Sequence, residues 1–287
     1  MNDRPGKMRD PRRWKHLTRR DVQAAEEILQ RNEILYVGAA GRFLRRSRGA
    51  DRVWVLKDRE GTVSGLLIQS RQTLFPVFPG SLPLPRFLNR FFGYRPLHAV
   101  QGLREEAELL ENGMTRLGFS PRESIDYELM ALDRAPPADR RREGPGGLVF
   151  RRPAACDMAD LFALQSGYEK EEVLPSGAVF NPASCRLGLE RILAEGSILA
   201  AELDGRLVGK INTSAVSFTR CLIGGVYVLP GCRGLGIARR MTAEFVRPLI
   251  AEGMGISLFV KKRNPAALSV YRRLGFTSVS DYRISYY

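Results

Sequence analysis

The sequence predicts a mixed α+β protein built in two halves. Residues 133–147 (DRAPPADRRREGPGG) combine proline, glycine and arginine, a composition typical of an exposed connector. On both sides of this segment, β-branched and alternating apolar runs indicate strands, and apolar residues at helical spacing indicate helices. A chain of 287 residues is long enough for two ordinary domains. We therefore expect an α+β domain at residues 1–135, a linker at 136–147 and a second domain at 148–287.

In the first half, Thr18 or Asp21 is a candidate N-cap for a helix that ends at Asn32. Two apolar runs, joined by a short turn that ends in glycine, are typical of a β-hairpin. The expected strands are residues 52–57, 62–69 and 125–132, and a further helix is expected at residues 103–117.

The second half has a clearer alternation of elements. A hairpin is expected across Asp204 and Gly205. The expected strands are residues 148–152, 197–203, 206–216, 221–228, 256–260 and 283–287. The expected helices are residues 156–169, 183–194, 236–251 and 266–274.

Composition limits the function. The chain has 45 Lys and Arg against 31 Asp and Glu, a formal net charge of +14, and such a surface attracts polyanions: nucleic acid, anionic lipid or a phosphorylated ligand. The four cysteines show no C-x-x-C spacing and there are only two histidines. We expect reduced thiols, no metal site and no histidine-based triad. The arginine cluster at residues 140–142 is interpreted as a solvated linker, with a nucleic-acid contact as the alternative.

No segment predicts a membrane span. The apolar stretch at residues 74–94 is interrupted by four prolines and two arginines, so its phenylalanines are expected to pack into a core, with surface association as the alternative. The N-terminus is charged and lacks the apolar stretch of a signal peptide. We expect a cytoplasmic protein that acts as a monomer or homodimer.

The residues that carry the most chemistry are GGVYVLPGCRGLGIARRM, at positions 224–241. An apolar strand turns through a loop with Gly234 and Gly236 into a helix start. The first N–H groups of a helix lack intrahelical partners and favour anionic oxygen. Glycines let a phosphate approach the backbone, and Arg233 and Arg239 add charge. A phosphate-binding loop is therefore one interpretation, and plain loop geometry is the other.

A second segment, NPAALSVYRRLGF, follows downstream. Asn264 is placed to cap a helix with Pro265 at its first position, and Tyr271 lies two turns along. Together the two segments resemble the signatures of the GNAT superfamily of N-acetyltransferases. That family's loop has Arg or Gln, two residues, Gly, one residue, then Gly or Ala, which Arg233, Gly236 and Ala238 match.

The resemblance covers residues 148–287 and implies a mixed, mostly antiparallel central sheet flanked by helices. The segment YEKEEVLP at residues 168–175 resembles a tandem subgroup, so two such domains are expected. The first half lacks the glycine loop, which implies a diverged, degenerate acetyltransferase-like domain without a cofactor site.

The resemblance also implies a role for each matched residue. Acetyl-CoA would be the co-substrate, with its pantetheine paired to the strand and its pyrophosphate held by the loop. Tyr271 would protonate the leaving thiolate, its alternative being a packing residue. The cofactor-binding residues expected on this basis are Val226, Tyr227, Val228, Arg233, Gly234, Leu235, Gly236, Ile237, Ala238, Arg239 and Asn264.

An amine acceptor must lose a proton before it attacks, so a base is expected. The strand 222–228 contains no Asp or Glu, and Glu172 is the candidate, with a solvated charged turn as the alternative. The predicted function is acetyl transfer from acetyl-CoA to a primary amine of unknown identity. The alternative is a non-catalytic acyl-CoA-binding or nucleic-acid-associated protein that keeps the fold. Because CoA is itself anionic, no stable nucleic-acid complex is expected.

Overall fold

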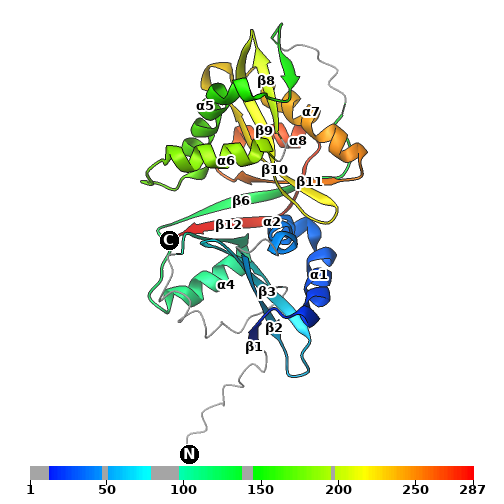
Figure 1. Cartoon of the computed structure of the whole chain (residues 1–287), viewed down its shortest axis with the longest axis vertical. Helices are drawn as coiled ribbons and strands as arrows, with labels where there is room; N and C mark the ends of the chain where they lie inside the picture. The colour runs from blue at the N-terminus through cyan, green and yellow to red at the C-terminus, as the bar shows by residue number, and fades with distance from the viewer. Residues whose placement is uncertain (1–12, 47–50, 79–96, 138–144, 195–197) are drawn as a thin grey trace, which may run out of the picture. The chain divides into compact units, whose positions relative to one another are not determined.

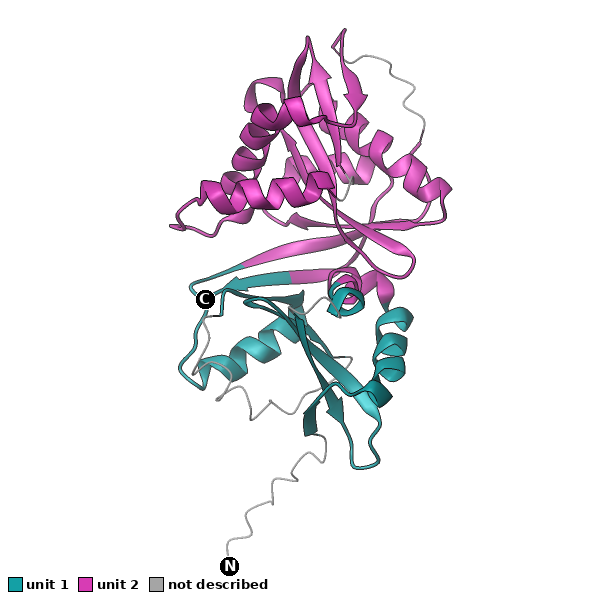
Figure 2. Ribbon diagram, in the orientation of Figure 1, with its two compact units in different colours: residues 1–32, 42–124, 283–287 teal, residues 33–41, 125–282 magenta. Residues whose placement is uncertain are grey.

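The computed structural model describes residues 13–46, 51–78, 97–137, 145–194 and 198–287. Its contacts divide the chain into two units (Figure 2): unit 1 holds residues 1–32, 42–124 and 283–287, and unit 2 holds residues 33–41 and 125–282. This grouping differs from a division at residues 136–147. The reason is that strand β6, Glu123–Leu132, pairs along Tyr127–Leu132 with a strand of unit 2. Most of the predicted linker, including its arginine cluster, lies outside the described residues.

Unit 1 is a sheet with strand order β1-β2-β3-β4-β5 and accompanying helices (Figure 1). Neighbouring strands are antiparallel except β4 and β5, which are parallel. Its strands are β1 Arg13–His16, β2 Asp51–Lys57, β3 Val63–Ser70, β4 Thr73–Val77 and β5 Ala99–Leu103. Its helices are η1 Arg19–Asp21, α1 Val22–Arg31 and α4 Arg104–Thr115, and α2, Glu33–Arg45, has residues in both units.

The predicted hairpin between β2 and β3 is confirmed, and its turn has a local cause. Asp58 Oδ1 accepts hydrogen bonds from the backbone N–H groups of Glu60 and Thr62, and Gly61 takes a φ of 91°. Beneath the sheet, α4 contributes Ala107, Leu110 and Met114 at helical spacing to a core with strand residues. Phe75 and Phe78 are buried as expected, while Phe87, Phe91 and Phe92 lie outside the described residues.

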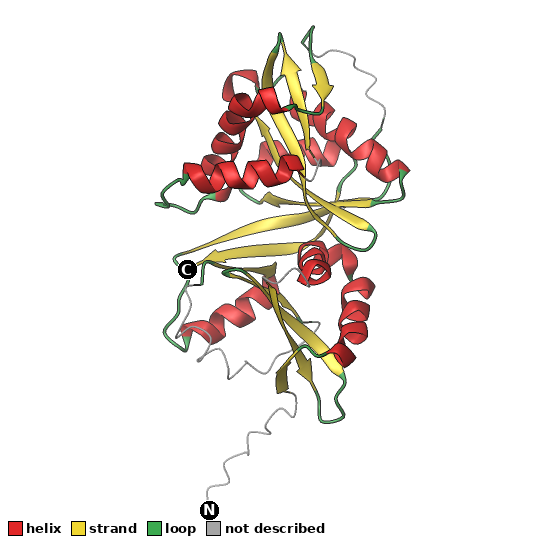
Figure 3. Cartoon of the chain, in the orientation of Figure 1, coloured by secondary structure: helices red, strands yellow, loops and turns green. Residues whose placement is uncertain are grey.

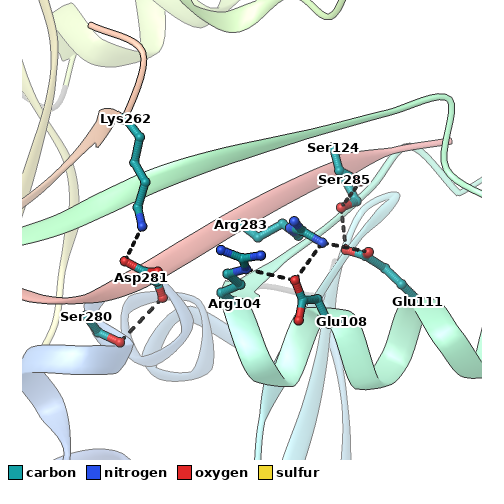
Figure 4. Close-up of polar contacts among 9 residues, drawn as sticks. All are labelled: Arg104, Glu108, Glu111, Ser124, Lys262, Ser280, Asp281, Arg283 and Ser285. Atoms are coloured by element: carbon teal, nitrogen blue, oxygen red, sulfur yellow. Dashed lines mark hydrogen bonds and ion pairs between the residues drawn. The ribbon is translucent and has the colours of Figure 1, made fainter. Parts of the chain in front are cut away.

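The last residues of the chain, 283–287, are held within unit 1 by the carboxylates of α4 (Figure 4). Arg283 Nη1 lies 2.9 Å from Glu108 Oε1 and 3.5 Å from Glu111 Oε2. The Ser285 hydroxyl donates to Glu111, and the backbone N–H of Tyr287 donates to the His98 carbonyl. Glu111 and Ser285 are both buried, so these contacts, with the hydrogen bond between the Ser124 and Ser285 hydroxyls, satisfy polar groups that water does not reach.

Unit 2 is a mixed, mostly antiparallel sheet with helices on both faces (Figure 3). The strand order is β12-β6-β11-β10-β9-β8-β7. The strands are β7 Val149–Arg151, β8 Ile198–Leu203, β9 Arg206–Val216, β10 Arg220–Val228, β11 Gly255–Lys261 and β12 Thr277–Tyr286, together with β6. The helices are η3 Ala155–Asp157, α5 Met158–Tyr168, η4 Glu169–Val173, α6 Pro182–Ala194, η5 Pro230–Cys232, α7 Ile237–Ala251 and α8 Pro265–Arg273.

The helices of unit 2 cover the sheet because successive strand residues point to opposite faces. Leu207 and Tyr227 pack with α5 and α6 on one face, and Val208 and Val228 pack with α7 and α8 on the other. The large core between the sheet, α7 and α8 also includes the buried Tyr271. Helices thus cover both faces of the sheet, which leaves the loops at the strand ends as the place for a site.

Several elements differ from the sequence prediction. β12 begins six residues before the predicted start at 283, because its first half is polar and gives no apolar alternation. β4 was not predicted since Pro76 interrupts it, and α2 was not predicted either. The predicted helix at residues 156–169 is a 3₁₀ turn, η3, followed by α5, and continues as the π-helical turn η4.

Candidate active site

The site starts where strands β10 and β11 part. The two strands are parallel and pair only from Arg220 opposite Gly255 to Leu222 opposite Ser257. Beyond Leu222, β10 continues beside β9 alone, with a bulge between Gly224 and Tyr227. A bulge redirects the strand and is frequent beside functional sites. Beyond its paired stretch, β10 therefore presents an edge on the side of β11.

After β10, the chain turns through η5 and the glycine loop into α7. Gly234 and Gly236 have φ values of 81° and 75°, the left-handed region that glycine adopts without strain. Gly236 is the N-cap of α7, with no side-chain cap, and the first helical hydrogen bond runs from Arg240 N–H to its carbonyl. A Cβ at either glycine would meet no atom within 4 Å, so the space beside the loop is open. Such a helix start offers N–H groups and positive potential to an anion.

Helix α8 supplies the second side of the site. Asn264 caps the helix, since its Oδ1 accepts a hydrogen bond from the Ala267 N–H at 3.0 Å. Its Nδ2 donates to Glu172 Oε1 at 3.3 Å. Tyr271 lies two turns further along and is buried, with its ring edge against Phe276. One asparagine therefore both starts the helix and contacts a carboxylate of η4.

The π-helical turn η4 brings two carboxylates to this place. Glu171 accepts hydrogen bonds from the Tyr227 hydroxyl at 2.6 Å and from Arg233 Nη2 at 2.8 Å. Glu172 Oε2 lies 3.3 Å from Lys261 Nζ, and the same ammonium donates to the Glu171 carbonyl at 3.1 Å. These contacts tie η4 to β10, β11 and the glycine loop.

A cavity of about 420 Å³ lies between these elements. It brings together every predicted site residue except Leu235, whose side chain is exposed instead. The predicted residues that line it are Glu172, Val226, Tyr227, Val228, Arg233, Gly234, Gly236, Ile237, Ala238, Arg239, Asn264 and Tyr271. The residues that line it without having been predicted are Glu171, Cys232, Ala266, Ala267, Ser269, Val270 and Arg273. Ala267, Val270 and Arg273 follow the helical spacing from Asn264, which is the signal that could have identified them.

The electrostatics of the cavity favour the ionised form of Glu171 and the protonated form of Tyr271. Burial opposes ionisation of Glu171, but the hydrogen bonds from Tyr227 and Arg233 outweigh it and lower its pKa. Burial, with Tyr168 and Glu172 nearby, raises the pKa of Tyr271 far above its usual value, so its phenol stays protonated at neutral pH. Arg233, Arg239 and Arg273 give the lining an excess of positive charge. The cavity thus combines cations, open helix N–H groups and a protonated phenol.

In the described part of the chain, no group of three or more His, Cys, Asp and Glu side chains is placed to hold a metal ion. None of the helices at residues 13–46, 51–78, 97–137, 145–194 and 198–287 has both the length and the apolar character that crossing a bilayer requires.

Comparison with known proteins places this site in a family. Residues 164–276 match the acetyltransferase (GNAT) family. Mycothiol acetyltransferase of Streptomyces avermitilis is 42% identical over 82 residues, which cover 27% of this chain and 26% of that protein. The matched stretch is thus about a quarter of the relative's length.

Solved structures show the fold over nearly the whole chain. A GCN5-related N-acetyltransferase from Sphaerobacter thermophilus has a TM-score of 0.63 at 18% identity, covering 97% of this chain and 96% of that one. A tandem GNAT protein from the clavulanic acid biosynthesis pathway has a TM-score of 0.59 at 14% identity, covering 96% and 98%. The mixed sheet and its flanking helices thus have the fold of these two structures over nearly the whole chain. Residues 164–276 are a domain of the GNAT family, as the strand, loop and helix motifs indicated.

Proposed function

We propose that this protein is an N-acetyltransferase that moves the acetyl group of acetyl-CoA directly to a primary amine. The observation that carries the proposal is the cavity at the start of α7, where the glycine loop, Arg233 and Arg239 meet Tyr271. The residues fit CoA, because the open loop and unpaired helix start suit a pyrophosphate and the free edge of β10 suits the pantetheine amides. In this proposal, Val226, Tyr227 and Val228 line the pantetheine and residues 233–239 hold the pyrophosphate.

The proposed reaction balances without a metal or redox partner. The amine nitrogen attacks the thioester carbonyl carbon, an N–C bond forms and the C–S bond breaks. Tyr271 gives its proton to the leaving thiolate. Because its pKa is raised, the phenol still holds that proton at neutral pH. Among the carboxylates lining the cavity, Glu171 is a weak base because its pKa is lowered. Glu172, with contacts of 3.3 Å to Asn264 and Lys261, is the one we propose to accept the amine proton.

The acceptor and the setting are also proposals. A relative is named mycothiol acetyltransferase, so that enzyme's acceptor belongs first among the amines to be tried. We infer a cytoplasmic location, because all four cysteines are free thiols, which suits a reducing compartment. The partners in this proposal are acetyl-CoA and the amine, in a monomer or homodimer that forms no stable nucleic-acid complex.

The test is a panel of amines assayed for release of free CoA from acetyl-CoA, with product detected by mass. We expect at least one amine to be acetylated at a rate above background hydrolysis. A protein that binds acetyl-CoA but acetylates none of a broad panel would favour a non-catalytic acyl-CoA-binding protein. Salt-sensitive binding of duplex DNA without transfer would favour a nucleic-acid partner instead.

A further inference from the structure

Lys210 is a fully buried lysine on β9 that the proposed reaction does not use. Its Nζ donates to Asn212 Oδ1 and to the Gly225 carbonyl, each at 3.0 Å. Both partners are neutral oxygens and neither is a carboxylate. An amine removed from water without an ion pair costs stability that an apolar side chain of the same length would not. The cost indicates that this amine has a task beyond packing.

Lys210 and Asn212 approach Gly225 so closely that a side chain would not fit there. Gly225 lies in the bulge of β10 and has a φ of 60°, which favours glycine. A Cβ there would lie 2.5 Å from Lys210 Nζ and 2.1 Å from Asn212 Oδ1. Only a residue without a side chain lets the carbonyl and the amine approach in this way.

The planar peptide group between Gly225 and Val226 links the Lys210 contact to the cavity. There is no cis peptide bond in the described parts of the chain. In a trans peptide the C=O and the N–H point in opposite directions, and they belong to one rigid plane. Fixing the Gly225 carbonyl toward Lys210 therefore directs the N–H of Val226 away from it, and Val226 lines the cavity.

We propose that Lys210 is a positioning residue for acetyl transfer, whose amine fixes and polarises the Gly225–Val226 peptide so that the Val226 N–H donates to the thioester oxygen. The inference rests on the proposed function. An ammonium bonded to a carbonyl strengthens the donor at the other end of the same peptide, because linked hydrogen bonds polarise one another. The donor would act most strongly when the oxygen gains charge during attack.

The surroundings make this device sensitive to pH. Burial lowers the pKa of Lys210 to about 7, and the Coulombic attraction of Glu169 opposes that shift. Burial raises the pKa of the Cys185 thiol. Burial and the hydrogen bond to Glu171 raise the pKa of Tyr227, which lies opposite Lys210 on β10, to about 12. The ring of Tyr168 on α5 lies 5.1 Å from Nζ. Lys210 is therefore the group here expected to change charge near neutral pH, and its polarising effect is lost as pH rises.

The test uses acetyl-CoA labelled with ¹³C at the thioester carbonyl and the infrared frequency of that carbonyl when bound. In the wild type we expect a lower frequency than in free acetyl-CoA, and a smaller shift as pH rises through about 7. Lys210→Met should bring the frequency back toward the free value. It should also lower kcat about tenfold or more on an acceptor found by the amine panel, since complete loss of an oxyanion donor typically costs about a hundredfold to a thousandfold and this variant only weakens the donor. KM for acetyl-CoA should change little.

The matched control is Lys262→Met, which removes one lysine charge from an exposed pair with Asp281, Nζ to Oδ1 2.5 Å (Figure 4). It should leave the frequency unchanged. Should Lys210→Met fail to fold, Asn212→Asp decides, because a carboxylate beside Nζ raises the pKa of Lys210 and must move the pH response upward. An unaltered frequency in folded Lys210→Met, or an unmoved pH response in Asn212→Asp, overturns the inference. Absence of acetyl-CoA binding to the wild type by calorimetry would instead overturn the proposed function itself.

Discussion

The Tyr271 side chain shows how a single residue can serve both packing and chemistry. Its ring belongs to the core beneath the sheet, in edge contact with Phe276, while the residue also lines the cavity. Burial keeps its phenol protonated at neutral pH, as the proposed role of proton donor requires. The packing and the donor can be separated by a change that keeps the ring.

Tyr271→Phe is expected to preserve folding and acetyl-CoA affinity and to reduce kcat. Loss of a general acid typically costs about a hundredfold to ten-thousandfold, and the loss should appear in kcat more than in KM. Steady-state kinetics on an identified acceptor, with calorimetry for acetyl-CoA affinity, measure both. A mutant with the wild-type kcat would assign Tyr271 to packing and the proton to water.

Lys210 makes a second residue-scale prediction, on stability. Its pKa is about 7 in the folded chain against a usual 10.5, so between these values the unfolded chain holds a proton that the folded chain has released. The free energy of unfolding should therefore gain a rising contribution between about pH 7 and 10.5, approaching about 1.4 kcal/mol per pH unit. Denaturant unfolding of the wild type and Lys210→Met at several pH values measures the difference in slope. Parallel stability curves would contradict the low pKa, and Lys262→Met should behave as the wild type.

At the scale of elements, the site depends on how one strand, one loop and one helix succeed each other. Strand β10 has a bulge, and its pairing with β11 ends at Leu222, so one edge of β10 is free beyond that residue. Two glycines with positive φ then bring the backbone to the start of α7. The same helix is followed by Gly253, which also has a positive φ, 83°, and where an added Cβ would meet no atom within 4 Å. The chain thus contains a matched pair of glycines at the two ends of one helix.

Gly236→Asp is expected to weaken acetyl-CoA binding strongly, because it places a carboxylate where the pyrophosphate is proposed to bind. Gly253→Asp carries similar backbone strain but lies away from the cavity, so its affinity should match the wild type. Calorimetric titration of both folded variants with acetyl-CoA gives the comparison. Equal affinities in the two variants would remove the phosphate-binding role of the loop.

At the scale of the whole molecule, the two units are unequal in chemistry. The Arg-x-x-Gly-x-Ala loop occurs in unit 2 and has no counterpart between a strand and a helix in the first half of the sequence. In unit 1, the buried carboxylates of α4 are used to hold chain segments: Glu106 accepts from the Phe78 N–H, and Glu111 accepts from Ser285. These two carboxylates therefore serve the structure of unit 1 itself.

We accordingly expect one acetyl-CoA site per chain. Calorimetric titration should give a stoichiometry near one, and Gly236→Asp should strongly weaken that single binding event. Two binding events, one of which survives in Gly236→Asp, would show that unit 1 also binds the cofactor.

The features that the sequence determined by itself are local ones. The glycine loop, the Asn264 cap and the position of Tyr271 on α8 depend on neighbours a few residues away, so their pattern is visible in the chain. The tertiary structure decided the rest. Glu171 meets Tyr227 from 56 residues away, and Lys210 meets the carbonyl of Gly225 across two strands and a bulge. Such contacts depend on strand register and on which acceptor lies beside a buried charge. A short stretch of sequence determines neither of these.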